Sequence, residues 1–548
     1  MPTTSAFASS AAASTASSLR PLPEDRFGYW EACHLLNRAG FGATPQETRK
    51  VADLGLEEAV KYVVRQQGAA ADEAVTAAGF DGNIMRPYTD AERQAYRRAQ
   101  EMQDEATVER FRRQRQARQA DDRRQLREVQ RWWFERLVAT DRPLIEKMTL
   151  FWHGHFATSY RGTENSYHLY MQNQLFRRHA LGSFAELCQQ IIRDPAMLAY
   201  LNNDNSRSRA PNENLARELM ELFTLGEGNG YAERDIKEGA RALTGYTFDH
   251  NEFIFRNQWH DTGSKRILGA AGNHNGDDFV KLILNRPEAS QFICLKLYRY
   301  FVNDLPDGPD RDTQRYILAL ASEFRRSGYS IASVLEQLFS SAHFYEPANV
   351  RSQIKSPIML AVGSCRMLGL PVPNIDTLLD ASALMGQNLF LPPSVKGWEG
   401  GRSWINTSTL FVRQNLLVHL LTGAMPGQSN SGRGRREAGA GEDMFSMAMR
   451  RRRARFLAEA RGGAANGATA AGFNAMHLLE DLHRTHHEVS AEEAALYLLR
   501  LCLGADVHES RQATVVNYVR DRGLTTLGND DVVNVLCLIT SMPEFQLC

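Results

Sequence analysis

The sequence predicts a mainly α-helical protein, and three observations support this fold class. Residues 47–67, 90–141 and 184–200 repeat apolar side chains with the period of an amphipathic helix. Runs of alternating β-branched residues, which would indicate strands, are scarce. The chain has 548 residues, of which 43% are hydrophobic, so it is long enough to bury a large core. We therefore expect one large multi-helix domain together with a smaller helical module.

Composition divides the chain into four parts. Residues 1–25 are rich in Ser and Ala and predict a disordered tail. Residues 26–424 predict the main helical domain, with irregular loops rich in Gly, Pro and Trp. Residues 425–472 predict a flexible linker rich in Gly, Arg and Ala, which contains a short basic helix at 444–460. Residues 473–548 predict a compact C-terminal helical module.

Composition also argues against several classes of protein. The chain carries 64 basic and 64 acidic residues, so no overall field attracts nucleic acid. Its seven cysteines form no CxxC pair, which argues against a disulfide framework or a cysteine-rich zinc module. No apolar run is long enough to span a membrane. The tail has no basic segment followed by a leucine-rich core, so it does not read as a secretory signal and favours a cytoplasmic location.

Residues 92–130 are densely charged and predict a long helix. Such a segment could bind an acidic partner, but ion pairs between residues four apart on a solvated helix are the commoner reason for this pattern. The segment turns apolar at residues 132–134, where we expect it to enter the core.

His153 and His155 flank Gly154 in the sequence FWHGHF and are the first candidate metal ligands. On a helix this spacing points the two rings to opposite faces, whereas an extended backbone puts them on one side. Gly154 favours an irregular turn, in which both imidazoles could bind one metal ion. The alternative is structural, with one ring at a helix end and the other hydrogen-bonded in the core.

Residues 212–226 predict a helix that carries acidic groups beside its apolar stripe. Glu218 and Glu221 lie on one face of this helix, and Arg217 lies beside them. Carboxylates so close to a core must be paired, hydrated or bound to a metal. Either they form an Arg–Glu network, with Arg217 and Arg241 as partners, or they complete a histidine–carboxylate metal site.

Two further segments supply candidate catalytic groups. His260 and Asp261 are adjacent and could act as a base and its orienting partner, or could only form a solvated turn. The loop at 391–406 contains two prolines and two tryptophans, so it cannot be a regular helix. Its Lys396 could line a site, whereas the tryptophans alone would make the loop a structural clamp.

These segments resemble the bacterial "domain of unknown function 1800" family. The resemblance rests on eight motifs in order along the chain, namely LLNRAGFGATPQE, FWHGHFATS, NENLARELMELFTLG, YAERDIKEGARALTGYTF, HDTGSK, KLYRYFV, PPSVKGWEGG and SMPEFQ. It covers the chain from about residue 30 to its end. The family has no established activity. The resemblance also implies export and a sulfatase-like partner protein.

Two functions from different classes follow. In the first, the protein is a metal-dependent enzyme, hydrolytic or oxidative, that holds one iron, manganese or zinc ion. The predicted metal ligands are His153, His155, Glu218 and Glu221. The predicted catalytic groups are His260, Asp261, Arg217 and Lys396. In the second, the protein is a non-catalytic helical scaffold or binding protein, and its polar motifs are structural networks.

Overall fold

The computed structural model describes residues 19–65, 79–370, 372, 374–422, 473–485, 488–504 and 507–548. The predicted linker at 425–472 and residues 1–18 of the predicted tail lie outside these ranges. Residues 19–25, which we assigned to the tail, belong to the fold: Leu22 is buried, and its backbone N–H donates to the carbonyl of Ser340 at 2.8 Å.

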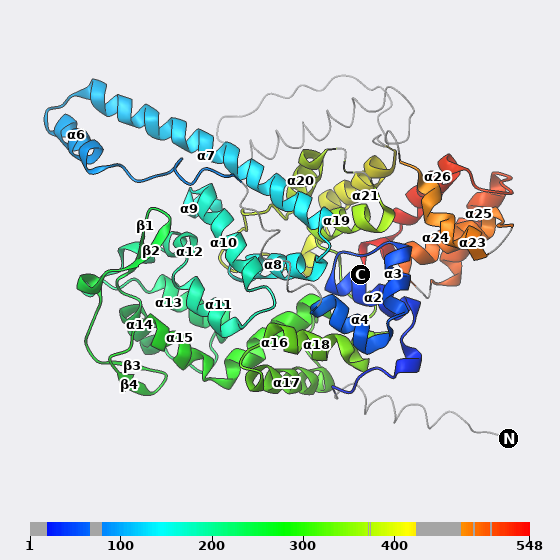
Figure 1. The fold of residues 1–548 in the computed structure, drawn as a ribbon, viewed down its shortest axis with the longest axis horizontal. Helices are drawn as coiled ribbons and strands as arrows, with labels where there is room; N and C mark the ends of the chain where they lie inside the picture. The colour runs from blue at the N-terminus through cyan, green and yellow to red at the C-terminus, as the bar shows by residue number, and fades with distance from the viewer. Residues whose placement is uncertain are drawn as a thin grey trace.

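The protein is mainly α-helical, as predicted (Figure 1). The first helices are α2 (Tyr29–Ala39), α3 (Pro45–Ala52), α4 (Gly55–Val64), α6 (Asp90–Glu101), α7 (Glu105–Ala139), α8 (Pro143–His155), α9 (Tyr160–Thr163) and α10 (Ser166–Arg178). The central helices are α11 (Phe184–Ile191), α12 (Pro195–Tyr200), α13 (Asn214–Glu218), α14 (Glu233–Ala242), α15 (Gly276–Leu284), α16 (Pro287–Phe301), α17 (Arg311–Arg326) and α18 (Ile331–Ser340). The last helices are α19 (Pro357–Leu368), α20 (Ile375–Leu384), α21 (Thr407–Thr422), α23 (Glu480–Thr485), α24 (Ala491–Leu503), α25 (Glu509–Asp521) and α26 (Asn529–Thr540).

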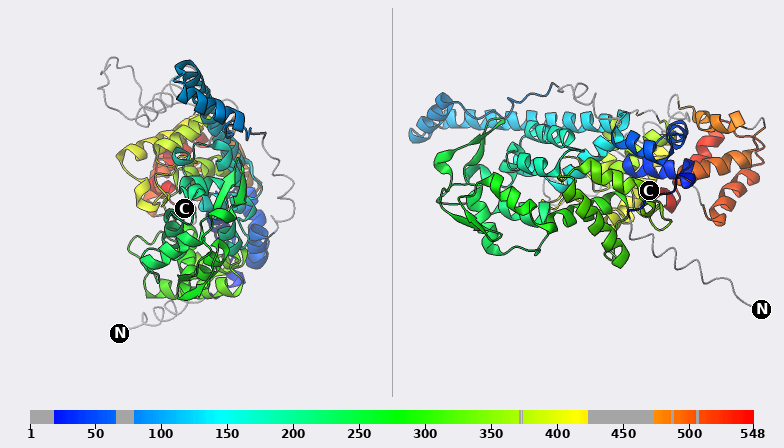
Figure 2. Two further views of the ribbon diagram at one scale, coloured as in Figure 1. Left: turned by 90° about the vertical axis from the view of Figure 1, so that its left-hand side faces the viewer. Right: turned by 60° about the horizontal axis from the view of Figure 1, so that its bottom comes forward.

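Within the described ranges, strands form two small antiparallel sheets. Strands β1 (Tyr246–Asp249) and β2 (Glu252–Phe255) form one hairpin, and β3 (Lys265–Ile267) and β4 (Ala270–Gly272) form the other. Both lie at the end of the molecule opposite the C-terminal helices (Figures 1 and 2). No helix in the described part of the chain is both long and apolar enough to cross a membrane.

Local sequence sets several helix starts through reciprocal capping. At the start of α3, the Glu47 N–H donates to the Thr44 hydroxyl at 3.3 Å, and the Thr44 N–H donates to the Glu47 carboxylate at 2.9 Å. Thr89 and Glu92 repeat this arrangement at α6. Each pair has the Ser/Thr-x-x-Glu spacing that places two otherwise unpaired N–H groups within reach of side chains.

The charged segment at 92–130 forms two helices rather than one. Helix α6 ends at Glu101, Gln103 has a positive φ of 53°, and Asp104 caps α7 by accepting from the Thr107 N–H at 3.1 Å. The pair projects from the body of the protein, and α7 then runs back along it (Figures 1 and 2). As expected, α7 becomes apolar where it enters the core, at the fully buried Trp133 and Phe134.

Two clusters of buried apolar side chains hold the elements together. The first joins α2–α4 and α8 with α11–α18. The second joins α7, α19, α20 and α21 with residues 473–548. The C-terminal helices therefore share a core with the main domain, and α26 packs directly on α21.

Candidate functional site

His153 lies near the end of α8 in an aromatic enclosure. Its ring is 5.1–5.5 Å, between centroids, from those of Trp133, Phe390 and Trp398. Its Nε2 accepts a hydrogen bond from the Phe390 N–H at 3.0 Å. Burial lowers the pKa of His153 to about 3, so the ring is neutral at neutral pH.

His155 lies on the other side of α8 and has a different backbone partner. Its Nε2–H donates to the Phe223 carbonyl at 2.9 Å, and its ring stacks on Phe151. Burial, assisted by the charge of Lys296, lowers its pKa to about 3. The two rings therefore contact different neighbours and project from opposite faces of the helix.

The expected irregular turn at Gly154 is absent, because α8 continues through His155. The close approach of the loop at 391–400 to this helix depends on Gly397, since a Cβ on Gly154 would meet only Trp398, at 3.9 Å. A Cβ on Gly397, whose φ is +76°, would lie 2.1 Å from the Gly154 carbonyl oxygen. A side chain at position 397 would thus collide with the backbone of α8. The loop packs against α8, and the rings of its Trp398 and of the preceding Phe390 lie beside His153.

Arg217 is the centre of a partly exposed Arg–Glu network. The Arg217 guanidinium donates to Glu213 at 3.1 Å, to Glu221 at 3.3 Å and to Glu233 at 3.1 Å. Helix α13 widens at its end into a π-helical turn over Leu219–Thr224. The His155 ring binds the carbonyl of Phe223 in this turn, so the motif is attached to α8 through its backbone.

Glu218 differs from its neighbours. It is half-buried, and it forms no hydrogen bond or ion pair with any other described residue. Burial, followed by the charge of Glu221, raises the pKa of its carboxyl group. Lys396 lies close enough to lower that pKa but forms its own ion pair with Glu227 at 2.6 Å.

His260 and Asp261 belong to a separate turn between the hairpins. The His260 Nδ1–H donates to the Thr244 carbonyl at 2.8 Å. Asp261 accepts two hydrogen bonds from Arg241, at 2.7 and 3.1 Å, and these bonds lower the pKa of the carboxyl group. Both side chains therefore hold the turn to α14.

The structure thus brings only part of the predicted site together. Arg217, Glu218 and Glu221 share one helix, with Lys396 in electrostatic range. From the sequence we also expected His153, His155, Glu218 and His260 to converge in one pocket. Each of the three histidine rings binds a different backbone group, and the shared pocket stays a prediction. Among the described residues, no three His, Cys, Asp or Glu side chains are grouped so as to hold a metal ion.

Two polar features escaped the sequence analysis. The first is a buried network, in which Arg177 binds the Glu146 carboxylate at 2.7 and 2.9 Å. The single Glu in the mostly apolar segment PLIEKMTLFWH could have indicated this network in the sequence. The second is a shallow pocket of about 510 Å³ lined chiefly by amide side chains, those of Asn202, Asn205, Asn212 and Asn214. The high density of asparagine at residues 202–214 could have indicated this pocket in the sequence.

The fold and these networks define a mainly α-helical protein whose polar motifs lie on short helices and loops. A sequence model of the family described as protein of unknown function (DUF1800) matches residues 34–547, so the chain belongs to that family. The resemblance carried by the eight motifs is therefore confirmed. No curated protein and no solved structure matches the chain.

Proposed function

We propose that this protein is a non-catalytic helical binding protein whose polar motifs are structural networks. The observation that carries the proposal is the hydrogen bonding of His153 and His155. Each ring uses Nε2 to bind a backbone group, on opposite sides of α8. Because His153 accepts through Nε2, its Nδ1 carries the proton, and neither nitrogen can bind a metal while this bond is kept. His155 donates from Nε2–H and keeps an Nδ1 lone pair, but its ring lies on the opposite side of α8, so the two rings do not face one metal ion.

The same bonds give the histidines a structural task. His153 ties α8 to the loop before Leu391, and His155 ties α8 to the π-helical turn after Glu218. Leaving the buried Phe390 N–H without a partner would cost about 1–3 kcal/mol. Export, a sulfatase-like partner and a cytoplasmic location stay predictions from the sequence.

The second candidate is a metal-dependent enzyme, and Glu218 favours it. A half-buried carboxyl group with a raised pKa and no protein partner among the described residues is typical of a functional acid or base. Glu221 lies one turn away and could share an iron, manganese or zinc ion with it.

Elemental analysis of the full chain, purified without a histidine tag, separates the two functions. The scaffold proposal expects no stoichiometric metal in the wild type and a lower melting temperature for His153→Ala. Glu218→Gln is the matched variant, because its side chain holds no partner among the described residues; it should melt at nearly the wild-type temperature. A stoichiometric metal that is lost in both variants, with His153→Ala still folded, would establish the metal site instead.

A further inference from the structure

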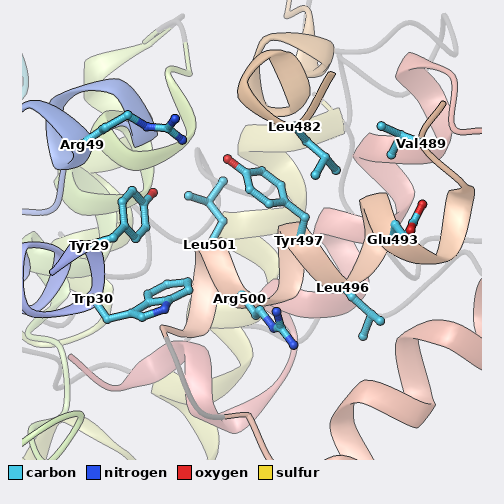
Figure 3. A pocket seen from close by; sticks show the side chains of 10 residues that line it. All are labelled: Tyr29, Trp30, Arg49, Leu482, Val489, Glu493, Leu496, Tyr497, Arg500 and Leu501. Carbon is cyan, nitrogen blue, oxygen red and sulfur yellow. The ribbon is translucent and has the colours of Figure 1, made fainter. Parts of the chain in front are cut away.

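A pocket of about 470 Å³ lies between the N-terminal helices α2 and α3 and the C-terminal helix α24 (Figure 3). This volume is within the range of about 300–1,000 Å³ that is usual for small-molecule sites. The pocket is at the opposite end of the molecule from the Arg217 network (Figures 1 and 2). None of the motifs that define the predicted site lines it.

Most of the pocket wall is apolar. Trp30 lines it from α2, Leu482 from α23, and Leu496 and Leu501 from α24. The Trp30 ring is held edge-on against Tyr29, with 5.1 Å between the centroids. Such a wall removes hydrocarbon from water, at about 25 cal/mol for each Å² covered.

Three polar groups gather at one end of the pocket. Figure 3 shows the Arg49 guanidinium and the hydroxyls of Tyr29 and Tyr497 near one another, with Leu501 beside them. Among the described residues, neither hydroxyl has a hydrogen-bond partner. Burial raises the pKa of both phenols, so they remain protonated and can donate.

The pocket offers a ligand two cationic donors, Arg49 and Arg500, beside the acidic Asp481 and Glu493. Within the described residues, Arg49 forms one ion pair, of 3.4 Å with the buried Asp481, which leaves most of its N–H groups for a ligand. Arg500, at the rim, has no ion pair within the described part of the chain. Glu493 keeps its negative charge, but its carboxylate already accepts from both the N–H and the hydroxyl of Ser490 at 2.9 Å.

We propose that this pocket binds a small amphipathic monocarboxylate. The carboxylate receives hydrogen bonds from Arg49 and from the Tyr29 and Tyr497 hydroxyls, and the hydrocarbon lies on the wall formed by Trp30 and Leu496. A guanidinium with two phenols offers a carboxylate several charge-assisted donors at once. A cationic head group would instead meet Arg49 and Arg500. The inference is independent of the proposed function, because no residue of the pocket belongs to the polar motifs.

Three probes with the same ten-carbon chain test the proposal by calorimetry on the full-length protein, below their micelle concentrations. Decanoate should bind with one-to-one stoichiometry and at least tenfold more tightly than decanol. Decyltrimethylammonium should bind more weakly than either. Equal affinity for all three probes, or uptake of several molecules per chain, would mean detergent-like adsorption and would overturn the proposal.

Two variants test the polar end. Arg49→Gln should weaken decanoate binding by tenfold or more and leave decanol binding unchanged. Tyr29→Phe removes only a hydroxyl that has no partner among the described residues, so the protein should stay folded and lose about tenfold in decanoate affinity. Arg520→Gln is the matched control, since Arg520 pairs with Glu492 outside the pocket. If Tyr29→Phe and Arg520→Gln both bind decanoate as tightly as the wild type, the proposed carboxylate position is wrong.

Discussion

Two charged networks in this protein use the same types of side chain in opposite environments. Around Glu146, the carboxylate and its partner Arg177 are 1% and 4% exposed, and the Trp133 indole also donates to the carboxylate, at 3.0 Å. Around Arg217, the guanidinium is 32% exposed and its partner Glu233 is 57% exposed. The first network is inside the core, and the second is partly exposed to water.

The comparison shows that the density of charged residues in a sequence does not indicate how much their ion pairs contribute to the free energy of unfolding. The charged residues of the segment NENLARE are obvious in the sequence, yet water and salt screen the ion pairs that they form. Glu146 is the single acidic residue of a mostly apolar helix. Removing its charge would nevertheless leave Arg177 as an uncompensated buried cation.

Glu146→Gln gives the largest expected effect. It keeps the side-chain volume but removes the charge that faces Arg177, so the free energy of unfolding should fall by about 3–5 kcal/mol. Urea denaturation followed by circular dichroism measures the change. Glu233→Gln is the matched control in the exposed network, and an equal loss in both variants would contradict the distinction between them.

The pKa of Glu146 is held below its ordinary value in the folded protein, although burial opposes this, because Arg177 lies against it. A lowered carboxyl pKa contributes stability that is present above the unfolded pKa and is lost as the pH falls through the folded pKa. Glu146→Gln should therefore remove part of the loss of stability in acid as well as lowering stability at neutral pH.

The buried histidines give the next effect, at milder pH. In the folded protein His153 and His155 stay neutral down to a pKa of about 3, whereas in the unfolded chain they take up protons near pH 6.5. The unfolded state thus binds more protons between these values, and stability falls as the pH falls. Each histidine contributes a slope of about 1.4 kcal/mol per pH unit. His155→Gln should flatten the slope between pH 6 and pH 4 by that amount. An unchanged slope would show that His155 is accessible to protons in the folded state.

Much of the fold could be predicted from local sequence. The candidate site could be predicted from local sequence only in small part. The helical class, the family and the caps at Thr44 and Thr89 depend on residues within a few positions of one another. The state of His153 depends on Phe390, which is 237 residues away in the chain. Spacing alone could not decide between an irregular turn and a helix at Gly154, because glycine is compatible with both. The close approach of the neighbouring loop depends on Gly397, which is 243 residues away.

The exposed network gives the smallest expected effect. Arg217→Gln removes ion pairs to Glu213, Glu221 and Glu233, but all four side chains are in contact with water. Exposed pairs contribute about 0–1 kcal/mol each and weaken in salt. The variant should lose no more than about 1 kcal/mol at low ionic strength, and the difference from wild type should shrink in 0.5 M salt. Paired melts at both salt concentrations measure this. A loss as large as that of Glu146→Gln, unaffected by salt, would mean that the motif around Arg217 is buried in the functional state, because only a partner covering this surface would remove the screening.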